Sequence, residues 1–270
     1  MDEHGKIYWH DAFFEALQLE FYQYKDALHF DDEYRLSEEA LRMDVLVIKK
    51  DKHVQIDKNI GKIFKEHNIF EYKSESDGFS LWDYNKSLGY ALLYSSFEQV
   101  PMSEITVSIS LTIYPRELVK FLQNERGLTI QELSKGIYYV EGDIVPVQIL
   151  ESKHLPSESN IFLRNLRTNL SAEDMLKTLQ SYKERKPLND KCVFLDRLVK
   201  ANPSAFTEVL NMSEAVKEIF LEGAEKYGWL EDKLVDNKKK IAKKLLLLGD
   251  PIEKVAEATE LPLETVRALM

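Results

Sequence analysis

The sequence predicts an α/β fold in residues 1–155, with one mixed central sheet flanked by helices, followed by an all-α region in residues 156–270. Two patterns predict it. Up to about residue 155, segments with helical apolar spacing alternate with short apolar or β-branched runs. Beyond that point no strand pattern recurs. Hydrophobic residues make up 44% of the 270-residue chain, which is ample material for such a core.

The first region begins with a predicted helix over residues 8–30, where Phe13, Leu17 and Phe21 recur at helical spacing. The elements expected after it are a strand at 43–50, a short amphipathic segment at 57–67, a strand at 68–74, a helix at 80–97, a strand at 104–115 and a helix at 115–127. Two further strands around a Gly142-Asp143 turn are predicted within residues 136–152.

The second region reads as successive helices, at residues 171–185, 190–203 and 212–234, and then as a tail of three short helices. The tail is a candidate cap or homodimerisation element. The alternative is a helix-turn-helix-like DNA reader. The dimer interpretation is favoured because Arg267 is the sole base in the segment that would enter the groove.

Charge and composition exclude several classes of protein. A net charge of −10 argues against a general nucleic-acid coat. Residues 41–73 nevertheless carry eight basic against five acidic side chains, and residues 236–244 form a second basic cluster. A polyanion could bind at either cluster, or the lysines could lie on solvated surfaces.

Residue counts also indicate the compartment. The single cysteine, Cys192, excludes an intramolecular disulfide and a cysteine-based zinc cluster. No apolar run approaches the roughly 20 residues of a membrane helix, and the N-terminus lacks the pattern of a secretory signal. We therefore expect a cytoplasmic protein without a membrane partner.

The candidate chemistry lies in the predicted strand "NIFEYKS", where Glu71 and Lys73 are two residues apart and therefore share one face. Glu-x-Lys occurs four times in the chain, but only this copy follows a strand that opens with an acid, Asp44. If the two strands are neighbours, Asp44, Glu71 and Lys73 converge at one end of the sheet. The two carboxylates suit Mg²⁺ (or Mn²⁺), and the lysine suits the developing charge of a phosphodiester.

The first helix adds another acid. At about 100° per residue, Glu20 falls on the stripe of Phe13 and Leu17, whereas Glu15 falls on the opposite side, which is expected to be wet. A carboxylate on an apolar face needs a partner. That partner is either the metal site, in which Glu20 would assist, or water at the edge of the stripe.

These residues resemble a known family. A helix with an acid, the strand "RMDVLVIKK", the strand "FEYK" and a following helix are similar to the PD-(D/E)XK nuclease superfamily. The tail "IAKKLLLLGDPIEKVAEATELPLETV" resembles one bacterial branch, labelled PD-(D/E)XK nuclease family transposase or recombination-promoting nuclease (Rpn-like). The resemblance implies a restriction-endonuclease-like sheet. It also implies Mg²⁺-dependent cleavage of DNA, with Asp44 and Glu71 as metal ligands and Lys73 as the catalytic lysine. The alternative is a nuclease fold that has lost catalysis and only binds nucleic acid or protein.

Overall fold

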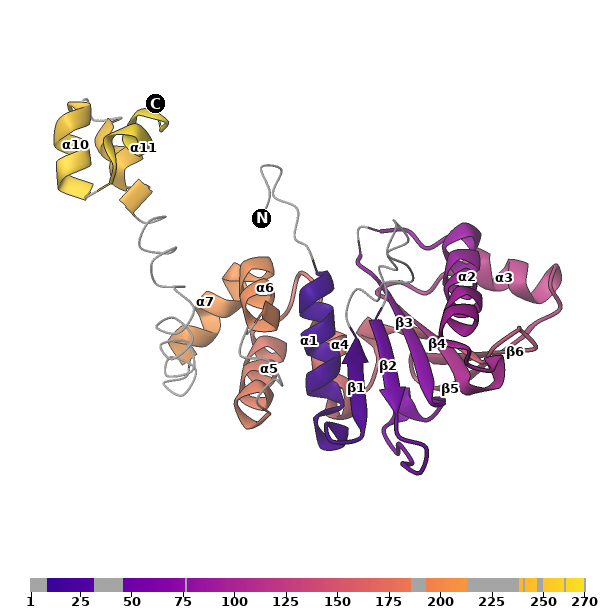
Figure 1. Ribbon diagram of the computed structural model, residues 1–270. Coiled ribbons are helices and arrows are strands. Elements are labelled where there is room, and N and C mark those ends of the chain that lie inside the picture. The colour runs from indigo at the N-terminus through magenta and orange to yellow at the C-terminus, as the bar shows by residue number, and fades with distance from the viewer. Residues whose placement is uncertain are drawn as a thin grey trace. The chain divides into compact units, whose positions relative to one another are not determined.

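The computed structural model describes residues 9–31, 46–75, 77–185, 193–212, 238–239, 241–246, 250–259 and 261–269 (Figure 1). The chain divides into two compact units, Met1–Met212 and Ser213–Met270. The first unit is an α/β structure built on one mixed sheet, as the sequence predicts, and helices follow the sheet toward the C-terminus.

The sheet has seven strands in the order β1-β2-β3-β4-β7-β6-β5. Their bounds are β1 Leu28–Asp31, β2 Leu46–Lys50, β3 His67–Lys73, β4 Ile105–Leu111, β5 Thr129–Ser134, β6 Ile137–Glu141 and β7 Val147–Glu151. The central strands β3, β4 and β7 run parallel, and every other neighbouring pair is antiparallel. The carboxyl ends of β3, β4 and β7 therefore meet at one edge of the sheet.

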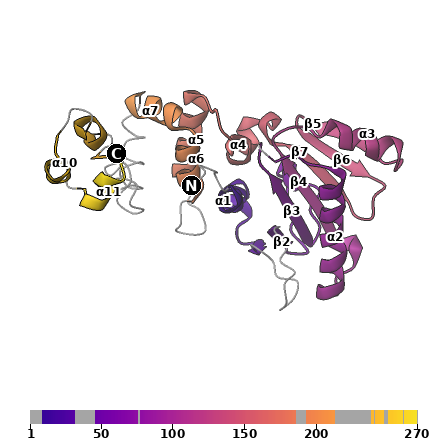
Figure 2. The ribbon, with the colours of Figure 1, turned by 90° about the horizontal axis from the view of Figure 1, so that it is seen from above.

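Helices cover both faces of this sheet (Figure 2). Helix α2 (Leu81–Glu98) and helix α3 (Arg116–Asn124) pack on one face, where Tyr84 and Leu122 join a core with Ile69 of β3. Helix α1 (His10–Glu20) covers the other face, where Phe13 contacts the rings of Phe70 and Tyr72. Successive side chains of β3 thus serve the two faces in turn.

Two strands differ from the prediction. The expected helix 8–30 ends at Glu20; a 3₁₀ turn at Tyr22–Tyr24 follows, and then the edge strand β1. Strand β1 forms because its backbone pairs with β2, with Leu28 opposite Lys50, and this distant pairing overrides the local helical spacing. The opposite edge strand, β5, was not expected, since its mostly exposed residues carry no apolar alternation.

The first unit continues well past residue 155. Its helices beyond the sheet are α4 (Ser157–Asn165), α5 (Ala172–Glu184), α6 (Val193–Ala201) and α7 (Pro203–Met212). Helix α1 lies between the sheet and α5 and α6 (Figures 1 and 2). The expected boundary at 155 thus marks the end of the strands, while α4 and α6 pack against α1 within the same compact unit.

This second layer on α1 overturns the expectation for Glu15. Its side chain is buried, not wet. One carboxylate oxygen accepts from the Tyr182 hydroxyl at 2.9 Å, and the other accepts from the backbone N–H of Phe194 at 2.8 Å. Burial raises the pKa of the Glu15 carboxyl, although both hydrogen bonds act in the opposite direction. Glu15 therefore satisfies a donor in the first turn of α6, a role for which no local pattern exists.

The second unit has a small core of its own. Residues 241–246 are helical, and α10 (Ile252–Thr259) and α11 (Leu263–Arg267) follow. Ala242, Val255, Leu261 and Val266 are buried together. Homodimerisation through this unit stays a prediction. A truncation at about residue 235 would test it, because the mass in solution should then fall from that of a dimer to that of a monomer.

Candidate active site

Strand β3 confirms the predicted strand at 68–74 and places Glu71 and Lys73 on the face covered by α2. Glu71 lies opposite Ile109 and Lys73 opposite Leu111 in the parallel pairing with β4. The Lys73 ammonium lies 3.6 Å from a Glu71 carboxylate oxygen. The Glu71 side chain is 6% exposed and that of Lys73 is 23% exposed, so the pair is open to solvent on the lysine side.

Helix α2 brings a third charged group, Asp83, to this pair. Its Oδ1 lies 3.6 Å from the Lys73 ammonium. Asp83 is fixed by a capping box at the start of α2: its Oδ2 accepts from the Ser80 backbone N–H at 2.9 Å, and the Ser80 hydroxyl accepts from the Asp83 N–H at 3.3 Å. Lys73 therefore lies between two carboxylates, one on the strand and one on the helix.

The protonation of Asp83 reflects these contacts. Burial by itself would raise the pKa of its carboxyl, but the Ser80 hydroxyl and N–H and the nearby Lys73 ammonium hold that pKa below its usual value. Asp83 thus remains ionised beside Lys73 at neutral pH. The sequence signal for it was the "SLWD" capping box, which predicts a helix start and carries no hint of a contact with β3.

Glu151 was also passed over by the sequence argument. It ends β7 in the same row as Lys73, with Leu111 of β4 between them. Neighbouring strands are roughly 4.8 Å apart, which puts the two backbones about 10 Å apart. A Glu151 carboxylate oxygen lies 2.8 Å from Nδ1 of His154. The edge where the three parallel strands end therefore carries several charged side chains, although "ESK" looked isolated in the sequence.

The structure does not bring Glu20 to Glu71 and Lys73. Glu20 lies on α1, on the opposite face of the sheet, and Phe21 beside it stacks on Phe64, which precedes β3. The Glu20 side chain is fully buried, and the apolar-face placement is confirmed.

Both carboxylate oxygens of Glu20 have protein partners among the described residues. Its Oε1 accepts from the backbone N–H groups of Phe162 and Leu163 at 2.7 and 3.0 Å, next to a kink of α4 at Asn160. Its Oε2 pairs with the Lys58 ammonium at 2.8 Å. Lys58 also donates to the carbonyl of Ser159. The buried carboxylate on the apolar face of α1 is therefore paired with Lys58 and hydrogen-bonded to α4, and these contacts connect α1 to α4.

Asp44, the other expected metal ligand, lies outside the described residues. Within the described ranges, no group of three or more His, Cys, Asp or Glu side chains is arranged to hold a metal ion. The Mg²⁺ site formed by Asp44 and Glu71 stays a prediction. The Glu71 carboxylate, at the end of a strand and beside a lysine, is chemically suited to a hard divalent ion.

Comparison with known protein families, curated proteins and solved structures found no match. Among the helices that the structure describes, none has the length and apolar character needed to span a bilayer.

Proposed function

We propose that this protein is a metal-dependent DNA endonuclease with a restriction-endonuclease-like core, which hydrolyses phosphodiester bonds at the Glu71–Lys73 site. One observation carries the proposal: Glu71 and Lys73 share one face at the carboxyl end of a central strand, with their charged atoms 3.6 Å apart. The order of elements, from an acidic helix through the Glu-x-Lys strand to a helix, also supports it.

Each residue has a defined task in this proposal. Asp44 and Glu71 would hold Mg²⁺ (or Mn²⁺), which when bound would supply Lewis-acid polarisation of the phosphodiester and activation of water. Lys73 places its ammonium against the negative charge that develops on the phosphate. Asp83 positions Lys73 by holding its ammonium from the helix side. The resemblance to a transposase-labelled bacterial branch favours a role in recombination, mobile elements or defence.

The test is nicking of supercoiled plasmid DNA with Mg²⁺ or Mn²⁺. Lys73→Ala is expected to slow nicking about 100- to 1000-fold, the usual effect of deleting one charge-stabilising group. Asp44→Ala and Glu71→Gln are expected to abolish it. Lys153→Ala is the matched control, because it removes the lysine of the other strand-end Glu-x-Lys triplet. Nicking that persists in both Asp44→Ala and Lys73→Ala, with unchanged circular dichroism, would exclude this site.

The second candidate function is nucleic-acid or protein binding by a nuclease fold that has lost catalysis. The contact between Lys73 and Asp83 favours it, because a lysine shared by two carboxylates is less available to a phosphate. Under this function the purified protein binds DNA with a steep salt dependence and leaves plasmid intact at every metal concentration.

A further inference from the structure

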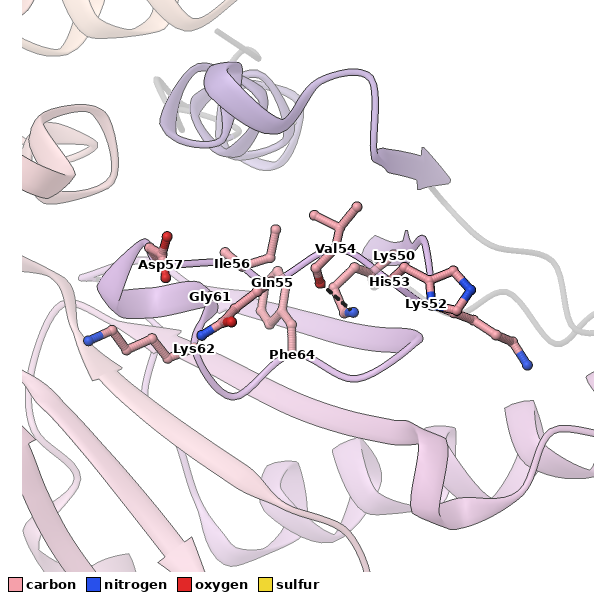
Figure 3. Close-up of a pocket in the computed structure, with 10 residues that line it drawn as sticks. All are labelled: Lys50, Lys52, His53, Val54, Gln55, Ile56, Asp57, Gly61, Lys62 and Phe64. Carbon is pink, nitrogen blue, oxygen red and sulfur yellow. Dashed lines mark hydrogen bonds between the residues drawn. The ribbon is translucent and has the colours of Figure 1, made fainter.

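The connection between β2 and β3 lines an open pocket of about 580 Å³ (Figure 3). This volume lies in the range of roughly 300–1,000 Å³ that is usual for small-molecule sites. The pocket is at the opposite end of β3 from Glu71, because Lys50 at its edge donates its backbone N–H to Glu66, just before β3 begins. It is therefore separate from the candidate active site.

The charged side chains that line this pocket are predominantly basic. Lys50, Lys52 and Lys62 contribute ammonium groups, against one carboxylate, that of Asp57. The Lys50 ammonium donates to the Val54 carbonyl at 2.9 Å, the dashed line in Figure 3, and to the Asp51 carbonyl at 3.2 Å. Carbonyls fix the position of this charge without neutralising it.

The other two lysines differ in their pairing. Lys52 is 72% exposed and lies 3.3 Å from Glu66, a weak surface pair. Lys62 is exposed and forms no ion pair with any residue in the described part of the chain. The pocket thus keeps a surplus of positive charge.

Part of the pocket wall, at Ile56, Gly61 and Phe64, is closely packed. Phe64 is buried and stacks on Phe21 of the α1 region, with ring centroids 5.2 Å apart. Gly61 allows the buried Ile56 to approach closely, since a Cβ at Gly61 would lie 2.5 Å from Ile56 Cγ2. This packing fixes the backbone from which Lys62 projects, while the side chains of Lys52 and Lys62 remain exposed to solvent.

We infer that this pocket binds the phosphate group of an anionic ligand. Lysine ammonium groups recognise phosphate as point charges. The Lys50 ammonium lies near the middle of the loop, and Lys52 and Lys62 extend toward its two ends (Figure 3), so the pocket presents a local positive charge to an anion despite the acidic net charge of the chain. The phosphate belongs either to a free phosphorylated small molecule or to a nucleic-acid backbone, and the chemistry of recognition is the same.

The test is calorimetric titration of the full-length protein with inorganic pyrophosphate. Wild type is expected to bind saturably. Lys62→Glu is expected to weaken binding about 10- to 100-fold, the equivalent of one lost charge-assisted contact, and Lys62→Gln to weaken it less. Lys65→Glu is the matched control, because Lys65 is exposed, three residues away and outside the lining, and the change in net charge is identical. Absence of saturable binding, or equal weakening by Lys62→Glu and Lys65→Glu, would overturn the inference.

A competition experiment identifies the source of the phosphate. Displacement of pyrophosphate by a short DNA duplex, lost in Lys62→Glu, assigns the pocket to a nucleic-acid backbone. Pyrophosphate binding that the duplex leaves intact assigns it to a small phosphorylated molecule, and either result supports a phosphate pocket. Lys73→Ala is expected to bind pyrophosphate like wild type, so that failure of the nuclease proposal and failure of this inference are distinguishable.

Discussion

Glu20→Ala is expected to lower the free energy of unfolding by about 3–5 kcal/mol, the usual cost of removing one partner of a buried ion pair. The magnitude follows from what the change leaves behind. The Glu20 carboxylate is fully buried and Lys58 is only 10% exposed, so its ammonium would lose its counter-charge in a poorly solvated site. The backbone N–H groups of Phe162 and Leu163 would lose their acceptor as well.

Urea unfolding followed by circular dichroism measures this loss. With a urea dependence of about 3 kcal/mol per molar, the midpoint should fall by about 1 M or more. Glu117→Ala is the control, because Glu117 is 88% exposed and its pair with Lys120 should contribute less than about 1 kcal/mol.

Two further variants separate the ion pair from the hydrogen bonds to the backbone. Glu20→Gln keeps an acceptor for α4 and should cost less than Glu20→Ala. Combining Glu20→Gln with Lys58→Met removes both charges and should recover part of the loss. A Glu20→Ala protein as stable as wild type but unable to nick DNA would refute this reasoning and make Glu20 a catalytic residue.

Three other predictions concern stability. The pKa of Glu15 is raised in the folded state, so its contribution to stability is complete below the unfolded pKa of about 4.5 and is lost as pH rises through the folded pKa. In urea titrations at a series of pH values, the stability of wild type relative to Glu15→Gln should therefore fall as pH rises. Parallel curves of stability against pH would contradict this. Gly61→Ala should cost about 1–3 kcal/mol through the clash with Ile56, whereas Gly89→Ala, with open space in α2, should be neutral or stabilising in thermal melts. Ser80→Ala should cost about 1 kcal/mol by removing the cap of α2, and an unchanged melting temperature would count against that role.

The sequence predicted what depends on local pattern. Glu71 and Lys73 were placed on one face because side chains alternate along any strand, and the strand was recognised from its apolar flanks. The helix predicted at 80–97 followed from its apolar stripe, and it is observed at Leu81–Glu98. Both inferences needed only neighbouring residues.

The predictions that were wrong or incomplete concerned residues whose partners lie far along the chain. A helical wheel gives α1 one wet side, but α5 and α6 cover that side, so Glu15 is buried beside Tyr182 and Phe194. The helical wheel correctly predicted that Glu20 needs a partner, but it could not identify Lys58 and α4 as the partners. Strand β1 was missed for a related reason, since only its pairing with β2 distinguishes it from a continued helix.

The two buried carboxylates of α1 also bear on how the chain emerges from the ribosome. The backbone N–H donor of α4 to Glu20 comes 142 residues later, and the backbone N–H donor of α6 to Glu15 comes 179 residues later. The sheet is synthesised before either of these backbone donors, so the outer side of α1 stays uncovered until α6 has been synthesised. A nascent chain stopped at residue 155 would hold a finished set of strands and an unshielded helix, which is a species prone to aggregate. Synthesis of α6, and not completion of the sheet, is the step that covers the outer side of α1.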